Sequence, residues 1–159
     1  MSAADAPQPA IRRDGIVLGF DVGARRIGVA VGSAFGSGAR AVAVVDVHAV
    51  GPDWLQIERL CREWRPDGLV VGDPMSLEGG DQPIRKVAQG FARELHRRIK
   101  VPVVMVDERN SSQEAARRFA EDRAGGKRKQ RDAALLDAVA AAVIVERWLA
   151  APDDATVIA

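Results

Sequence analysis

The sequence predicts one α/β domain built on a mixed sheet. In its first part, short apolar runs of strand length follow one another closely, and further along the chain such runs alternate with helical patterns. A length of 159 residues fits one domain with its own core, and 47% hydrophobic and 28% charged residues are ordinary for a globular protein. We expect the domain to span residues 15–150. Residues 1–14 and 151–159 lack periodicity, so we expect flexible tails there.

The first apolar runs predict an antiparallel meander of three strands. Each run has the length of a strand, and glycines that favour tight turns lie between them. The runs cover residues 16–20, 27–31 and 41–47.

The pattern then changes to helices and buried strands. Apolar residues three and four apart from Trp54 to Trp64 indicate a helix, and the same spacing from Ile84 to Leu95 indicates another. The uniformly apolar runs 69–72 and 101–106 are typical of parallel strands covered on both faces. The predicted sheet is therefore five-stranded and mixed, a three-stranded antiparallel meander plus two parallel strands, flanked by helices.

Two further helices are expected near the C-terminus. Ser111 stands three residues before Glu114, which is the spacing of a capping box, so a helix is expected to run from there to about Arg123. A long apolar helix is expected over residues 132–149.

Asp137 is the most informative residue of that last helix. It is the only polar side chain between Leu135 and Val145, so the helix around it is apolar on nearly every side. An isolated carboxylate in such surroundings costs on the order of several kcal/mol. Asp137 must therefore be protonated, paired with a cation or bound to a metal, unless it lies in a solvent-filled slot.

Three more acids follow apolar strands. Asp21 ends the first strand, and Asp107 and Glu108 follow the apolar run 101–106. Ligand sites of open α/β sheets collect at such strand ends, although an acid there is also common in a plain turn. Alternate residues point to opposite faces, so only one of Asp107 and Glu108 can join a given site. These acids and Asp137 can meet along one edge of the sheet.

Three converging carboxylates without nearby Cys or His suit Mg²⁺ or Mn²⁺ better than Zn²⁺. Such clusters serve phosphoryl chemistry, in which the metal activates a water and stabilises the leaving oxygen. The segment 117–131 is strongly basic and can supply phosphate contacts, or it is simply a solvated loop. Its basic residues are Arg117, Arg118, Arg123, Lys127, Arg128, Lys129 and Arg131.

Other reactive side chains do not predict a site. Cys61 is the only cysteine and falls on the apolar face of its helix, so we expect inert packing and a reducing cytoplasm. His48 and His96 have no catalytic partner in the pattern. Residues 2–14 lack the apolar segment of a signal peptide, and no run of about eighteen apolar residues occurs, so we expect no membrane association.

Four short motifs occur in a fixed order over nearly all of residues 15–150. They are Gly19-Phe20-Asp21-Val22-Gly23 with Arg26-Ile27-Gly28-Val29-Ala30, Val70-Val71-Gly72-Asp73-Pro74, Val106-Asp107-Glu108-Arg109, and Asp137 ahead of an Ala/Val/Ile run. Through these motifs the chain resembles the YqgF (RuvX-like) family of pre-16S rRNA nucleases, relatives of the RuvC Holliday junction resolvases.

The resemblance implies a ribonuclease H-like fold and cleavage of precursor ribosomal RNA near the 5′ end of the small-subunit RNA. It also implies a divalent metal and a cytoplasmic location. Asp21, Glu108 and Asp137 match the acidic triad of the family, which makes them the catalytic and metal-binding candidates. Arg26 and Arg109 match its basic positions, where contact with phosphate or with the acids is expected. We expect nucleic acid to bind at Arg26, Arg109, Arg117, Lys127, Arg128, Lys129 and Arg131.

Three positions in two of the motifs depart from the family pattern. Asp73 stands where members more often have an apolar residue before Pro74, so this extra acid either repels substrate or joins the metal shell. Leu135 and Leu136 replace the basic residue and valine that often precede the last acid.

Alternative functions remain open from the sequence. Actin-like ATPases and sugar kinases also begin with Asp-x-Gly after a strand, but they need two such subdomains. A Holliday junction resolvase-like enzyme would prefer four-way DNA junctions and act as a dimer, and a non-catalytic module would bind nucleic acid or the ribosome. Expected partners are precursor ribosomal RNA or the small ribosomal subunit, or structured DNA, with the chain a monomer or homodimer.

Overall fold

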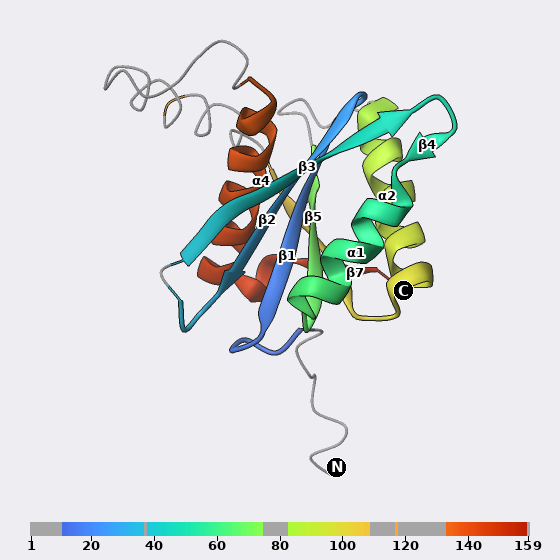
Figure 1. The fold of residues 1–159 in the computed structure, drawn as a ribbon. Helices are drawn as coiled ribbons and strands as arrows, with labels where there is room; N and C mark the ends of the chain where they lie inside the picture. The colour runs from blue at the N-terminus through green and yellow to red at the C-terminus, as the bar shows by residue number, and fades with distance from the viewer. Residues whose placement is uncertain (1–10, 37, 75–82, 109–116, 118–132, 159) are drawn as a thin grey trace.

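The fold is a seven-stranded sheet with helices on both faces (Figure 1). This computed structural model describes residues 11–36, 38–74, 83–108, 117 and 133–158. The strands are β1 Ile16–Val22, β2 Arg26–Ser33, β3 Gly38–His48, β4 Gly51–Pro52, β5 Gly68–Asp73, β6 Val103–Asp107 and β7 Thr156–Ile158. The helices are α1 Trp54–Trp64, α2 Pro83–Ile99 and α4 Ala133–Ala150.

The strand order is β4-β3-β2-β1-β5-β6-β7. The first three strands form the predicted antiparallel meander, and β1, β5 and β6 run parallel to one another. The prediction of a mixed α/β sheet is therefore confirmed. Parallel pairing brings the carboxyl ends of β1, β5 and β6 to the same edge of the sheet.

The count of five strands and the prediction of a tail at 151–159 are wrong. The short β4 pairs with the end of β3, and β7 pairs antiparallel with β6 after a 3₁₀ turn at Pro152–Asp154. Without β7, strand β6 would be an edge with unpaired backbone N–H and C=O groups, and β7 supplies their partners. Within the other expected tail, Ile11 is buried against Gly68.

Helix α1 begins and ends where its sequence predicts. The Asp53 side chain accepts a hydrogen bond from the backbone N–H of Gln56 at 3.2 Å and so caps the first turn. Arg65, with a left-handed backbone (φ 47°), ends the helix. Cys61 is buried, and burial raises the pKa of its thiol to about 11, which agrees with the expected packing role. The helix expected over residues 111–123 lies outside the described residues, apart from Arg117.

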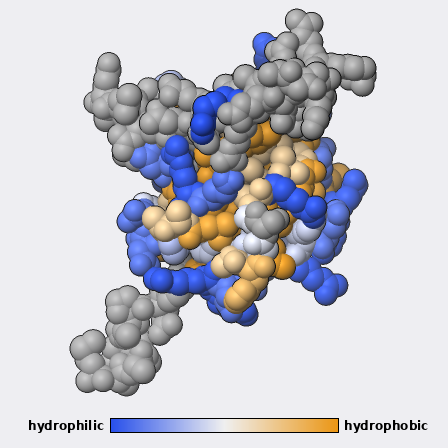
Figure 2. Space-filling model, turned by 90° about the vertical axis from the view of Figure 1, so that its left-hand side faces the viewer, coloured by the Kyte–Doolittle hydropathy of each residue, from blue (hydrophilic) through white to orange (hydrophobic). Residues whose placement is uncertain are grey.

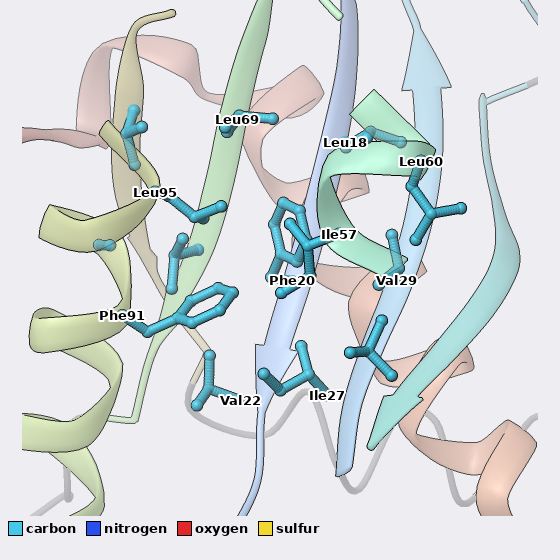
Figure 3. Packing of buried hydrophobic residues seen from close by; sticks show 14 of the residues in the cluster. Leu18, Phe20, Val22, Ile27, Val29, Ile57, Leu60, Leu69, Phe91 and Leu95 are labelled. Atoms are coloured by element: carbon cyan, nitrogen blue, oxygen red, sulfur yellow. The ribbon is translucent and has the colours of Figure 1, made fainter. Parts of the chain in front are cut away.

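Helices α1 and α2 cover one face of the sheet and bury the larger apolar cluster (Figures 1 and 3). Phe91 of α2 joins the two helices to the sheet, because its ring lies 5.5 Å from that of Phe20 and 5.3 Å from that of Trp54. Figure 3 shows Phe91 at the end of the cluster where Val22 of β1 and Ile27 of β2 point toward it. This face holds no acid of the predicted triad.

Helix α4 covers the opposite face and lies very close to the strands. A Cβ atom added to Gly28 would be 1.9 Å from the carbonyl oxygen of Asp137, and one added to Gly19 would be 2.3 Å from Val145 Cγ2. Only glycine permits this approach of helix to sheet. Hydrophobic side chains on the side of α4 and β3 are surrounded by hydrophilic ones (Figure 2). In the described part of the chain, no helix is long and apolar enough to cross a bilayer.

Replacing Gly28 with alanine should lower the free energy of unfolding by about 2 kcal/mol or more, because the new methyl group would overlap the backbone of α4. The measurement is urea unfolding followed by circular dichroism. Gly90→Ala is the matched control, since a Cβ there meets no atom within 4 Å and alanine favours the helix by about 1 kcal/mol. Equal stability of Gly28→Ala and the wild type would contradict the close packing.

Candidate active site

The alternation of side chains along β1 and β6 directs two acids toward α4. Leu18, Phe20 and Val22 face α1 and α2, so Asp21 faces the other side of the sheet. Glu108 lies one residue beyond Asp107 at the end of β6, and its Oε2 atom is 2.6 Å from the Cβ position of Gly72. Of the acid pair at this strand end, Glu108 is therefore the one beside Asp21.

Asp21 and Glu108 form a hydrogen-bonded carboxyl pair. Burial raises the pKa of both groups, and the negative charge of Asp21 raises the pKa of Glu108 further, to about 9. The Oε2 atom of Glu108 is shielded from solvent. At neutral pH Glu108 therefore carries a proton and donates it to the Asp21 carboxylate in a hydrogen bond.

Asp137 lies in the first turns of α4, and its negative charge also raises the pKa of Asp21. Its carboxylate accepts a hydrogen bond from Arg26 Nε at 2.9 Å. The Arg26 side chain is 44% exposed and that of Asp137 is 31% exposed. Pairing with a cation, one of the states that the apolar helix demanded, is thus the state that the structure shows for Asp137.

The three predicted acids do not form a ready metal cage. Among the described residues, no three His, Cys, Asp or Glu side chains are placed so that they could hold one ion together. The structure brings Asp21 and Glu108 into contact and leaves Asp137 beside them on Arg26. Oxygen donors of this kind suit Mg²⁺ or Mn²⁺.

Two arginines around the acids, Arg147 and Arg85, were not predicted as part of the site. Arg147 of α4 donates a hydrogen bond from Nη1 to the backbone oxygen of Asp107 at 3.0 Å. Its positive charge offsets part of the rise in the pKa of Glu108. Asp73 accepts two hydrogen bonds from Arg85 of α2, at 2.9 and 3.3 Å. The sequence signal for Arg147 was its position as the lone basic residue in the last turn of an apolar helix.

Asp73, the acid that departs from the family pattern, forms an ion pair with Arg85. The Asp73 side chain is 14% exposed and its partner Arg85 is 25% exposed, so the pair is largely shielded from water. The backbone oxygen of Asp73 accepts a hydrogen bond from Glu108 N–H at 3.0 Å, and its charge raises the pKa of Glu108. This extra acid therefore tunes the carboxyl pair from the end of β5.

The predicted nucleic-acid contacts are described only in part. Arg26 lies beside Asp137, and Arg117 is exposed and helical. The other predicted basic residues lie outside the described residues. They are Arg109, Lys127, Arg128, Lys129 and Arg131.

The described architecture is similar to the fold of solved RuvC structures. The structure of Thermus thermophilus RuvC matches with a TM-score of 0.52 at 21% identity, covering 90% of this chain and 99% of that chain. T. thermophilus RuvC in complex with Holliday junction substrate matches with a TM-score of 0.53 at 21% identity, with the same coverage. At this level of identity the likeness establishes the fold.

The chain belongs to the RuvX family, described as Holliday junction resolvase, which matches residues 15–151. A relative from Xanthomonas axonopodis pv. citri is 67% identical over 149 residues, 94% of this chain and 96% of the relative. Another, from Xanthomonas euvesicatoria pv. vesicatoria, is 67% identical over 147 residues, 92% of this chain and 95% of the relative. Both bear the name "Putative pre-16S rRNA nuclease". The family resemblance drawn from four motifs is confirmed.

The stability of the metal-free protein should fall as pH rises between the two pKa values of Glu108. Unfolded Glu108 loses its proton near pH 4.5, whereas the folded chain keeps it to about pH 9, so raising the pH in this window favours unfolding. Glu108→Gln removes this effect. With chelator present, it should be more stable than the wild type by at least about 1 kcal/mol at pH 8, since one pKa unit corresponds to about 1.4 kcal/mol.

The comparison is made by urea unfolding from pH 4 to pH 9. Glu63→Gln, an exposed substitution on α1, should retain the pH dependence of the wild type. A constant difference between Glu108→Gln and the wild type across this range would contradict the buried proton.

Proposed function

We propose that this chain is a metal-dependent nuclease that hydrolyses phosphodiester bonds in precursor 16S ribosomal RNA. The observation that carries the proposal is the buried carboxyl pair of Asp21 and Glu108 at the joint edge of β1 and β6. Carboxyl groups with raised pKa cluster at functional sites, because catalysis uses charges that folding alone would avoid. Membership in a family described as a resolvase supports phosphodiester chemistry at this edge.

The donor set fits a divalent cation at Asp21 and Glu108. Both side chains offer oxygen, and a cation would neutralise the repulsion that now keeps a proton on Glu108. When bound, Mg²⁺ or Mn²⁺ activates water and stabilises the leaving oxygen of a phosphodiester. In this proposal Asp137 is the third ligand, and it becomes available when its ion pair with Arg26 opens.

Arg26 is the proposed contact for the substrate phosphate. Its guanidinium group is half-exposed and now donates to Asp137. A phosphate offers the same group two charged oxygens in a geometry that suits arginine. Substrate binding then withdraws Arg26 from Asp137, so the binding of nucleic acid and the binding of metal favour each other.

Two arginines hold the framework of this site. Arg147 fixes the end of β6 through the Asp107 carbonyl, directly before Glu108. Arg85 fixes the end of β5 through Asp73, whose backbone in turn accepts the Glu108 N–H. These contacts keep Glu108 beside Asp21 while the exposed Arg26 moves.

Precursor 16S ribosomal RNA is the proposed substrate because relatives at 67% identity carry that name. This assignment puts the chain in the cytoplasm with the small ribosomal subunit or its precursor RNA as partner. The description of the family favours a second candidate substrate, the four-way DNA junction. Measuring cleavage of both substrates side by side distinguishes the two candidates.

Asp21→Asn should abolish cleavage of an RNA fragment that spans the 5′ end of 16S ribosomal RNA. The expected loss is about a hundredfold or more, since removing outer-shell partners of a metal already costs roughly 10- to 100-fold. Cleavage is measured with Mg²⁺, Mn²⁺ or chelator, beside a four-way DNA junction. Asp46→Asn, an exposed acid on β3, is the control. Wild-type rates in Asp21→Asn would refute the assignment, and cleavage of the junction alone would favour the DNA substrate.

Arg26→Gln should bind Mn²⁺ more tightly than the wild type in the absence of nucleic acid, because Asp137 loses its competing cation. The expected gain is about two- to fivefold, as partly exposed ion pairs contribute up to about 1 kcal/mol. Titration calorimetry measures this affinity. Arg25→Gln removes the same charge from the neighbouring residue and should leave it unchanged. Equal affinity in all three proteins would show that Arg26 does not compete with the metal.

A further inference from the structure

A hollow lies on the face of the sheet opposite the acids. It has a volume of about 690 Å³, within the range of roughly 300–1,000 Å³ that is usual for ligand pockets. Its walls come from the β1–β2 turn, the β3–β4 hairpin, the start of α1 and one side of α2. They are mostly apolar and include Val22, Ile27, Trp54, Val87 and Phe91.

Gly90 leaves this hollow open from the α2 side. It lies in the middle of a 17-residue helix, where glycine is destabilising, and it lines the hollow. A Cβ atom added there would meet nothing within 4 Å, whereas one added at Gly19 or Gly28 would meet packed atoms. Packing among the described residues therefore does not require this glycine, and the space beside it suits a group that those residues do not supply.

The hollow begins where the candidate active site ends. Asp21 faces α4, and the next two residues of the chain, Val22 and Gly23, line the hollow on the other face. Figure 3 shows Val22 and Ile27 pointing toward Phe91 on this side of the sheet. A nucleic-acid strand that passes over the β1–β2 turn from Asp21 reaches the hollow within a few residues of protein backbone.

The charge beside the hollow suits a phosphate backbone. Lys86 and Arg93 lie four residues before and three residues after Gly90, so helical spacing puts them on its side of α2, and both are exposed. Arg25 is exposed in the turn next to Gly23 and Ala24. The one acid in the lining is Glu94, and its carboxylate is paired with Arg97.

We propose that this hollow binds one unpaired base of the RNA strand whose phosphodiester lies at Asp21 and Glu108. The inference rests on the proposed function and deepens it by adding a base-binding subsite. Proteins that recognise single-stranded RNA hold unstacked bases against apolar and aromatic side chains and contact the flanking phosphates with basic residues. The accessible apolar side chains of the lining, Val47, Ile84 and Val87, supply the first kind of contact, because the Trp54 ring is already stacked on Phe91 and covered by Arg98. Lys86 and Arg93, just outside the lining, supply the second.

The test is to fill the hollow from Gly90. Gly90→Leu places a bulky side chain in it without overlapping any atom near the Cβ, and leucine favours the helix, so the fold should be retained. Gly90→Ala is the control for the backbone, and Gln89→Leu puts the same side chain on another side of α2. All variants also carry Asp21→Asn, so that binding is measured without cleavage.

Binding is measured by fluorescence anisotropy with a single-stranded RNA that spans the mapped cleavage position. A companion set of the same RNA carries one abasic site at each successive position. Gly90→Leu should bind the intact RNA about tenfold more weakly than Gly90→Ala and Gln89→Leu, because burying the face of one base against apolar side chains contributes on that scale. At one position, removing the base should weaken the controls equally and leave Gly90→Leu unaffected.

Unchanged RNA affinity of Gly90→Leu would overturn the base-binding subsite, as would a loss from Gly90→Leu that is the same at every abasic position. Either result would leave the nuclease proposal standing if the protein with Asp21 intact cleaves this RNA. Failure of the proposed function has a different signature, which is the absence of cleavage by the wild type.

Discussion

The close contact between α4 and the glycine-bearing face of the sheet is the constraint on which the site depends. Gly28 lets the helix backbone at Asp137 approach β2 more closely than any other residue would allow. That approach brings an acid of the last helix to the acid of the first strand. It also removes water from the space between them, which gives the carboxyl groups their unusual affinity for protons.

The same contact divides the acids into two states. Asp21 and Glu108 share a proton in the buried part of the site, whereas Asp137 reaches the boundary with solvent and is neutralised by Arg26. Both arrangements solve one problem, that of negative charges brought together in a poorly solvated space. A divalent cation is a third solution, and it differs from the others in its ability to activate a water molecule.

Sequence reasoning predicted the mixed sheet and the helices α1, α2 and α4, because α1 and α2 have a clear apolar period and α4 and the buried strands are continuous apolar runs. It singled out Asp137 because a polar residue in an apolar helix stands out. It expected Arg26 to contact phosphate or the acids, but it did not identify Asp137 as the partner, because the two residues are 111 positions apart and meet only through the register of β2 beneath α4. Nor did it find Arg85 and Arg147, because their partners depend on which strand ends the helices meet.

The missed strand β7 has a consequence for solubility. The three residues of β7 are too few to show the alternation of apolar and polar side chains that predicts a strand, yet they pair with the outer side of β6. A chain shortened before Thr156 would present that side of β6 to its neighbours in solution, and a bare parallel strand is a template for intermolecular pairing. The polypeptide after α4 thus protects the molecule from self-association, which is a colloidal property rather than a catalytic one.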